Sequence, residues 1–150
     1  LGAARFVRGH VDVAIALDES VRGPREALAC VKTGACDMFV VKLMKTGGIL
    51  NALKVNAIAE AAGITVMMGN MGESSIGLSA HFHLNLALAN AVHCDADLPG
   101  RPGGLMHDIG RGLRQEVGDG ISWIDVPDAP GLGIEIVEEH VERQRVARRW

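Results

Sequence analysis

Residues 37–70 read DMFVVKLMKTGGILNALKVNAIAEAAGITVMMGN, with a short apolar run on either side of a longer segment. The runs at 37–43 and 64–70 predict β-strands, because both are short and almost continuously apolar. The segment between them predicts a helix that stops at Gly63, since its apolar residues follow helical spacing. These residues are Ile49, Leu50, Leu53, Ala57, Ile58 and Ala61. A strand–helix–strand unit of this kind predicts a right-handed crossover between two parallel strands.

The same unit recurs on both sides of this stretch. VDVAIAL at 11–17 predicts an earlier strand, and GPREALACVKTG at 23–34 predicts a helix with proline near its start and glycine at its C-terminal cap. SSIGLSAHFHLNLALANA at 74–91 predicts a further helix, and VHCD at 92–95 predicts a fourth strand. Strands that alternate with helices predict an α/β fold, either a small doubly wound domain or half of an eight-stranded barrel.

The pattern changes after Pro99. LMHDIGRGLRQ at 105–115 predicts a short helix, whereas GISWIDVPDAPGLGIEI at 120–136 predicts extended, turn-rich chain. The last stretch, 138–149, predicts a terminal helix. The sequence contains no low-complexity segment.

Composition narrows the class of protein. The chain has 150 residues, is 48% hydrophobic and carries a formal charge of −3, which predicts one soluble globular domain with a substantial core. A mildly acidic chain gives no indication of a basic surface that would bind nucleic acid or an anionic membrane. No apolar run approaches the roughly 18 residues that span a bilayer. Three cysteines without CxxC spacing predict reduced thiols and a cytoplasmic location rather than disulfides or a zinc site.

Each predicted strand is followed by charged or amide side chains. The loops after parallel strands open on one rim, so these residues are candidates for a common site. They are Asp18 and Glu19, Lys42 and Lys45, Asn70 and Glu73, and Asp95 and Asp97.

Lys42 is the most informative of these residues, because it lies in an apolar strand where a lysine needs a partner or a lowered pKa. A lysine with a lowered pKa is a candidate general base. Asp18, one strand earlier, is either its partner or a ligand for a divalent cation.

Four motifs, ALDES, VVKLMKTGGI, GNMGESSIG and VPDAPGLGIEI, together resemble the muconate-lactonizing subgroup of the enolase superfamily. Within this subgroup, KLMKTGGILNALKVNAIAEAAGI and the Asp-x-Asp of CDAD resemble the dipeptide epimerases. The resemblance implies a (β/α)8 barrel with an α+β capping domain and one Mg²⁺. It identifies residues 1–117 as the C-terminal half of the catalytic barrel, strands five to eight. Residues 118–150 would be the C-terminal return segment toward the capping domain.

The resemblance also implies roles for the residues at the strand ends. Asp18 would be a metal carboxylate, with Glu19 either a second ligand or an outer partner, and Lys42 would be one of two acid/base lysines. Asn70, Gly72 and Glu73 would line the substrate pocket, and Asp95 and Asp97 would bind the ammonium group of a dipeptide.

The implied activity is Mg²⁺-dependent epimerisation, in which the α-proton of a carboxylate substrate is removed through a metal-stabilised enediolate. The other catalytic lysine and two metal carboxylates of the family lie outside these residues, so activity is expected only with an N-terminal half, in a homo-oligomer. A cycloisomerase, an N-acylamino acid racemase or an o-succinylbenzoate synthase of the same superfamily is an alternative. A non-catalytic α/β binding module is another.

Overall fold

The computed structural model describes residues 1–95, 98–99, 105 and 107–145. The chain divides into two compact units. The first unit comprises Leu1–Met71 and Leu84–Asp95, and the second comprises Gly72–His83 and Ala96–Trp150.

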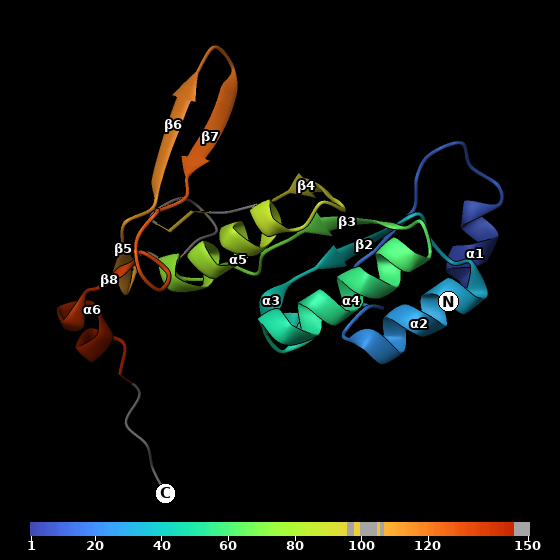
Figure 1. Ribbon diagram of the computed structural model, residues 1–150, viewed down its shortest axis with the longest axis horizontal. Helices are drawn as coiled ribbons and strands as arrows, with labels where there is room; N and C mark the ends of the chain where they lie inside the picture. The colour runs from blue at the N-terminus through green and yellow to red at the C-terminus, as the bar shows by residue number, and fades with distance from the viewer. Residues whose placement is uncertain (96–97, 100–104, 106, 146–150) are drawn as a thin grey trace, which may run out of the picture. The chain divides into compact units, whose positions relative to one another are not determined.

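The first unit contains a parallel sheet in which four strands lie in their chain order, β1-β2-β3-β4. The strands are β1 (Ala16–Leu17), β2 (Met38–Val41), β3 (Thr65–Met68) and β4 (Ala91–Cys94). The helices are α1 (Gly2–Arg8), α2 (Pro24–Thr33), α3 (Leu43–Thr46), α4 (Ile49–Ala61) and the end of α5 (Ser75–Ala87). Helices α2 and α4 pack side by side on one face of the sheet (Figure 1). This repeated strand–helix order confirms the predicted α/β class.

Local sequence explains where α2 begins and ends. Pro24 occupies its first turn, where a missing N–H costs nothing, and Gly34 ends it in the left-handed conformation with φ of 60°. Strand β1 is shorter than predicted, because only Ala16 and Leu17 pair with β2.

The core of the first unit lies between the sheet and its helices. It is formed by Val21, Ala27, Cys30, Cys36, Phe39, Val41, Ala52, Val55, Ala59, Ile64, Val66, Met68, Leu84 and Leu88. Most of the apolar stripe predicted for α4 does not face it: Leu50 is 75% exposed, whereas Ala52, Val55 and Ala59 are buried. Ile58 is the member of the predicted stripe that packs partly against the core. Small residues face the sheet because they let the helix approach closely.

Strand β4 lies at the edge of the sheet. Val92, His93 and Cys94 are exposed on it. The other two cysteines, Cys30 and Cys36, are buried thiols.

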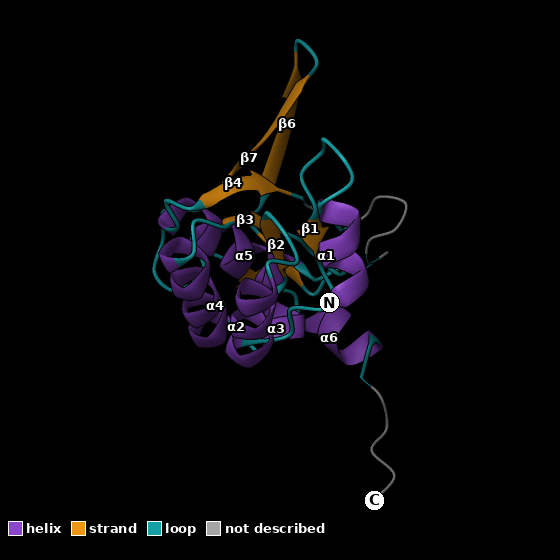
Figure 2. Ribbon diagram, turned by 90° about the vertical axis from the view of Figure 1, so that its right-hand side faces the viewer, coloured by secondary structure: helices purple, strands orange, loops and turns teal. Residues whose placement is uncertain are grey.

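The second unit begins with the N-terminal part of α5. Its strands are β5 (Gly110–Arg111), which pairs with β8 (Glu135–Ile136), and β6 (Arg114–Gly118), which pairs with β7 (Ile121–Asp125). Both pairs are antiparallel, and helix α6 (Glu138–Arg143) follows. Figure 2 shows β6 and β7 as a long hairpin. The extended character predicted for 120–136 is therefore confirmed.

The short helix predicted at 105–115 is wrong, since the described residues of this stretch contain β5 and the start of β6. Gly112 adopts φ of 137°, which a helix excludes, and β5 pairs with β8 instead. The hairpin turn follows ordinary rules: Asp119 and Gly120 both have positive φ, as a type I′ turn requires.

The predicted boundary between residues 117 and 118 stays a prediction. Over the residues that the structure describes, no helix is long and apolar enough to cross a membrane.

Candidate active site

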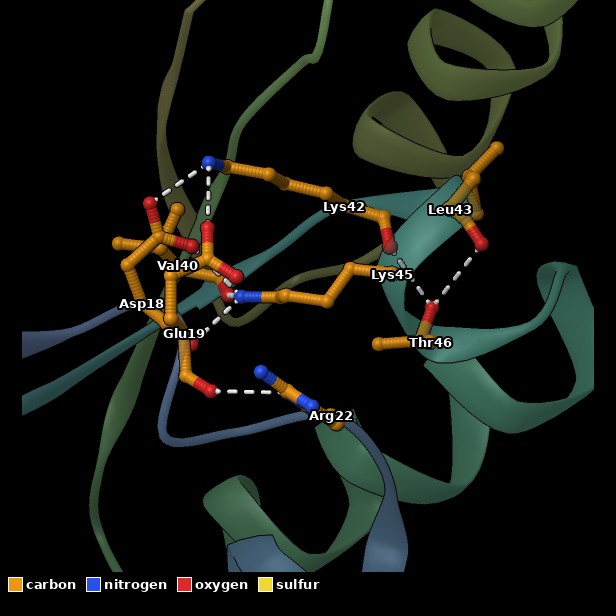
Figure 3. Close-up of polar contacts among 8 residues, drawn as sticks. All are labelled: Asp18, Glu19, Arg22, Val40, Lys42, Leu43, Lys45 and Thr46. Atoms are coloured by element: carbon orange, nitrogen blue, oxygen red, sulfur yellow. Dashed lines mark hydrogen bonds and ion pairs between the residues drawn. The ribbon is translucent and has the colours of Figure 1, made fainter.

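Asp18 lies directly after β1, and its carboxylate forms ion pairs with the ammonium groups of Lys42 and Lys45 (Figure 3). Lys42 Nζ lies 2.7 Å from Asp18 Oδ2, and Lys45 Nζ lies 2.6 Å from Asp18 Oδ1. Each carboxylate oxygen therefore faces its own cation. The carboxyl ends of two neighbouring parallel strands bring these three side chains together.

The short helix α3 places both lysines on the same side of the chain. Lys42 is its N-terminal cap residue, with extended backbone, and Lys45 follows three residues later. Thr46 secures this turn, because its hydroxyl donates to the carbonyl oxygen of Lys42 over 2.9 Å. Asn51 in turn donates to the carbonyl oxygen of Thr46 over 3.0 Å.

Lys45 is the more deeply placed of the two lysines, with a side chain only 4% exposed. Besides the carboxylate, its Nζ donates to the carbonyl oxygens of Asp18, over 2.6 Å, and Val40, over 2.8 Å. Its charge is thus balanced and its three donors are satisfied. The sequence pointed to Lys45 as a strand-end residue but suggested no role for it.

Glu19 is an outer partner of this cluster. Its side chain is 61% exposed, and its Oε1 lies 3.3 Å from Lys42 Nζ. Its backbone carbonyl accepts a hydrogen bond from Arg22.

The ion pairs shift the pKa values of the cluster. The hydrogen bond with Asp18 raises the pKa of Lys42 above its ordinary value, and this outweighs the lowering by burial. Partial burial works against ionisation of Asp18, but the hydrogen bonds and charges of Lys42 and Lys45 hold its pKa below the ordinary value. Of the two alternatives open for Lys42, a partner or a lowered pKa, the structure therefore has the partner, because an anion stands beside the ammonium group.

Gly69 is a site residue that the sequence reasoning missed. A Cβ atom at this position would lie 2.8 Å from Val40 Cγ1 and 3.3 Å from Lys42 Cε. The absence of a side chain lets Lys42 pass over the end of β3. The sequence signal for it was a glycine directly after the apolar run of β3, because a glycine in or beside a strand often marks the close approach of another part of the protein.

The other predicted site residues are dispersed between the two units. Asn70 is buried in the first unit. Asp95 is exposed at the end of β4, with its backbone N–H bonded to the carbonyl oxygen of Met68 over 2.8 Å. Gly72 and Glu73 begin the second unit, where Gly72 has φ of 72°. Asp97 lies outside the described residues.

The described part of the chain holds no group of three or more histidine, cysteine, aspartate or glutamate side chains able to bind a metal ion. Asp18 and Glu19 supply carboxylate oxygens, the donor type that suits Mg²⁺.

Comparison with known proteins shows the family to which the chain belongs. Residues 1–140 match the family described as Enolase C-terminal domain-like. The chain belongs to this family. The family assignment and the fold class inferred from the four motifs are thereby confirmed.

Three curated relatives illustrate the chemistry of the family. The chain is 38% identical over 134 residues to L-Ala-D/L-Glu epimerase of Bacillus subtilis, covering 89% of this chain and 35% of the relative. It is 36% identical to N-succinyl-L-Arg/Lys racemase of Bacillus cereus, covering 97% and 37%. It is also 36% identical to muconate cycloisomerase 1-1 of Acinetobacter lwoffii, covering 93% and 35%. The chain thus spans little more than a third of the length of these relatives.

A solved structure supports the same assignment. The dipeptide epimerase from Cytophaga hutchinsonii, complexed with Mg and the dipeptide D-Ala-L-Val, has a TM-score of 0.80 and 27% sequence identity. The match covers 95% of this chain and 37% of that one.

Proposed function

We propose that the protein containing this chain is a Mg²⁺-dependent epimerase that removes and returns the α-proton of a dipeptide. The observation that carries the proposal is the approach of Lys42 to Asp18, over 2.7 Å, at neighbouring strand ends. A proton carrier beside a carboxylate suited to a divalent cation is what α-proton abstraction next to a substrate carboxylate requires. The epimerases and the racemase among the relatives support the same class of reaction.

Asp18 would hold the Mg²⁺, and Glu19 would be a second ligand or an outer partner. Carboxylates elsewhere in the protein would complete the ligand set, since Mg²⁺ requires near-octahedral coordination. Bound there, the ion would place positive charge against the substrate carboxylate and make the adjacent α-carbon more acidic.

Lys42 would carry the proton at Nζ. As an acid it returns a proton to the α-carbon, which its protonated form in the ion pair suits. As a base it needs a neutral amine, and therefore has to leave the oxygen of Asp18. Its side chain is 14% exposed, so the amine end can reach a substrate.

Asp95 and Asp97 would bind the ammonium group of the dipeptide, because two carboxylates attract a cationic amine. Asn70, Gly72 and Glu73 would line the rest of the pocket. A cycloisomerase or an N-acylamino acid racemase would not need an ammonium-binding pair, and relatives of both kinds exist. The choice of substrate therefore separates the candidates.

The test is solvent exchange catalysed by the full-length protein. The protein is incubated in D₂O with Mg²⁺ and separate panels of dipeptides, N-acyl amino acids and muconate, and loss of the α-proton signal is followed by NMR. We expect exchange and inversion with dipeptides. Lys42→Ala should abolish exchange from one face of the α-carbon, whereas Lys54→Ala, at an exposed position of α4, should leave both faces active. Exchange that persists on both faces in Lys42→Ala would contradict the proposal.

A further inference from the structure

Asp108 is joined to the start of α5, although 33 residues separate it from Ser75. One carboxylate oxygen, Oδ1, accepts the backbone N–H of Ser75 over 3.0 Å. The other, Oδ2, accepts the hydroxyl of Ser75, a buried side chain. The first N–H groups of a helix have no partner within the helix, and its N-terminal end favours a negative charge. Asp108 therefore caps α5 from a distant part of the chain.

The segment that carries Asp108 is itself held firmly. Oδ1 also accepts the N–H of Gly110 over 3.3 Å, and the carbonyl oxygen of Asp108 lies 2.5 Å from Nδ1 of His140 in α6. A Cβ atom on Gly110 would lie 2.7 Å from Ile134 Cγ2 and 3.4 Å from Ser75 Cβ. The chain at 108–110 is thus packed directly against the first turn of α5.

A second contact ties α5 to the PGLG segment, residues 130–133. The buried hydroxyl of Ser79 donates to the carbonyl oxygen of Leu132 over 2.6 Å. The first two turns of α5 are therefore held by two separate segments of the second unit.

Glu73 stands two residues before this anchored helix. A Cβ atom on Gly77 would lie 2.8 Å from Glu73 Cβ and 3.1 Å from its Cγ. The stem of Glu73 thus crosses the first turn of α5 at a point where only glycine leaves room. A shift of that turn would move Glu73 with it.

We propose that Asp108 is a positioning residue for Glu73, and that it fixes the substrate preference of the pocket by holding the first turn of α5 in place. This inference rests on the proposed function, because it takes Glu73 as a pocket residue. Asp108 touches no reacting atom in this scheme. It acts through Ser75 and Gly77, and a small misplacement of a pocket group has a large effect on rate.

The experiment compares Asp108→Ala, Asp108→Asn and Ser75→Ala with Asp37→Asn in the full-length protein. Asp37 is the matched control, because its carboxylate also accepts a backbone N–H from a distant residue, Ile15, over 2.9 Å, but in the first unit. Two quantities are measured. One is the ratio of kcat/KM between two dipeptides, which does not depend on the fraction of folded enzyme. The other is the rate of amide hydrogen exchange over residues 72–78.

We expect Asp108→Ala to change the ratio of kcat/KM roughly tenfold. It should also speed exchange at 72–78 roughly tenfold, as loss of a helix cap does. Asp108→Asn keeps an acceptor for the N–H of Ser75, so the ratio of kcat/KM and the exchange rate at 72–78 should both stay close to their wild-type values. Ser75→Ala keeps the backbone hydrogen bond, so it gives a milder change in the same direction and serves if Asp108→Ala does not fold. Asp37→Asn should lower the Tm and leave both quantities unchanged.

An unchanged ratio in Asp108→Ala and Ser75→Ala overturns the inference, whether or not exchange at 72–78 is faster. If the wild-type protein acts on no dipeptide, the proposed function fails, and exchange at 72–78 then decides alone. Faster exchange in Asp108→Ala supports the positioning of Glu73 in that case, and unchanged exchange overturns it.

Discussion

Lys45 and Asp18 form the innermost ion pair of the strand-end cluster, with Lys45 Nζ 2.6 Å from Oδ1 and 2.6 Å from the backbone carbonyl oxygen of the same residue. Lys45 thereby binds both the side chain and the backbone that follow β1. Lys42 approaches the remaining carboxylate oxygen from a more exposed position. Lys45 thus holds Asp18 in place, whereas Lys42 is the more exposed of the two lysines.

Lys45→Met should destabilise the protein more than Lys42→Met. Methionine keeps the apolar stem but removes three hydrogen bonds and leaves the carbonyl oxygen of Val40 without its donor. We expect a loss of about 2 kcal/mol in the free energy of unfolding for Lys45→Met, and about 1 kcal/mol or less for Lys42→Met. Urea denaturation of the full-length protein measures both. Equal losses would show that Lys45 has no special structural role.

Gly69→Ala should reduce activity without unfolding the protein. The new methyl group would meet Val40 Cγ1 and the stem of Lys42, and moving Lys42 displaces its Nζ from Asp18. We expect kcat to fall roughly ten- to hundredfold. Gly2→Ala is the matched control, since a Cβ there meets nothing within 4 Å. Steady-state kinetics of both variants test this, and an unchanged kcat in Gly69→Ala would contradict it.

Asp37 should make stability depend on pH in the acidic range. The hydrogen bond from Arg8 and that from the N–H of Ile15 hold the pKa of Asp37 below its ordinary value of 3.8. A carboxyl whose pKa is lowered by folding contributes stability above its unfolded pKa, and this contribution is lost as the pH falls through the folded pKa.

The difference in Tm between wild type and Asp37→Asn should therefore be full at pH 7 and shrink below about pH 4. We expect it to be a few degrees, because the pair is partly exposed. Thermal unfolding across this range measures it. A difference that stays constant down to pH 2 would show that the charge of Asp37 contributes nothing.

Two glycines of the PGLG segment should respond differently to alanine. Gly131 and Gly133 both have positive φ, 72° and 64°, so both substitutions strain the backbone. A Cβ on Gly131 meets nothing within 4 Å, whereas one on Gly133 would lie 2.4 Å from Pro127 Cβ. We expect Gly133→Ala to cost about 2 kcal/mol more than Gly131→Ala in the free energy of unfolding. If denaturant titration gave equal losses in the free energy of unfolding for the two variants, Pro127 would have to move aside without a measurable loss of stability.

The sequence by itself determined the order and type of the main elements. Pro24 and Gly34 delimit α2 as predicted, because a cap depends on residues within one turn of it. The apolar runs at 38–41 and 65–68 form β2 and β3, since parallel strands covered by helices are apolar on both faces. The positions at neighbouring strand ends also made Asp18 either a partner of Lys42 or a cation ligand, and the structure has the ion pair. The role of Asp18 as a metal ligand stays a prediction.

The tertiary structure alone decided the features that depend on distant segments. The pKa of Lys42 is raised because Asp18 stands beside it, and Lys45 joins the cluster because α3 turns it inward. Leu50 is exposed although its spacing matches an apolar stripe, since the side of α4 facing the sheet is set by packing. Asp108 caps a helix that begins 33 residues before it. Hydrophobic spacing reports which residues lie on one side of an element, but the partner that side meets is settled only when the chain folds.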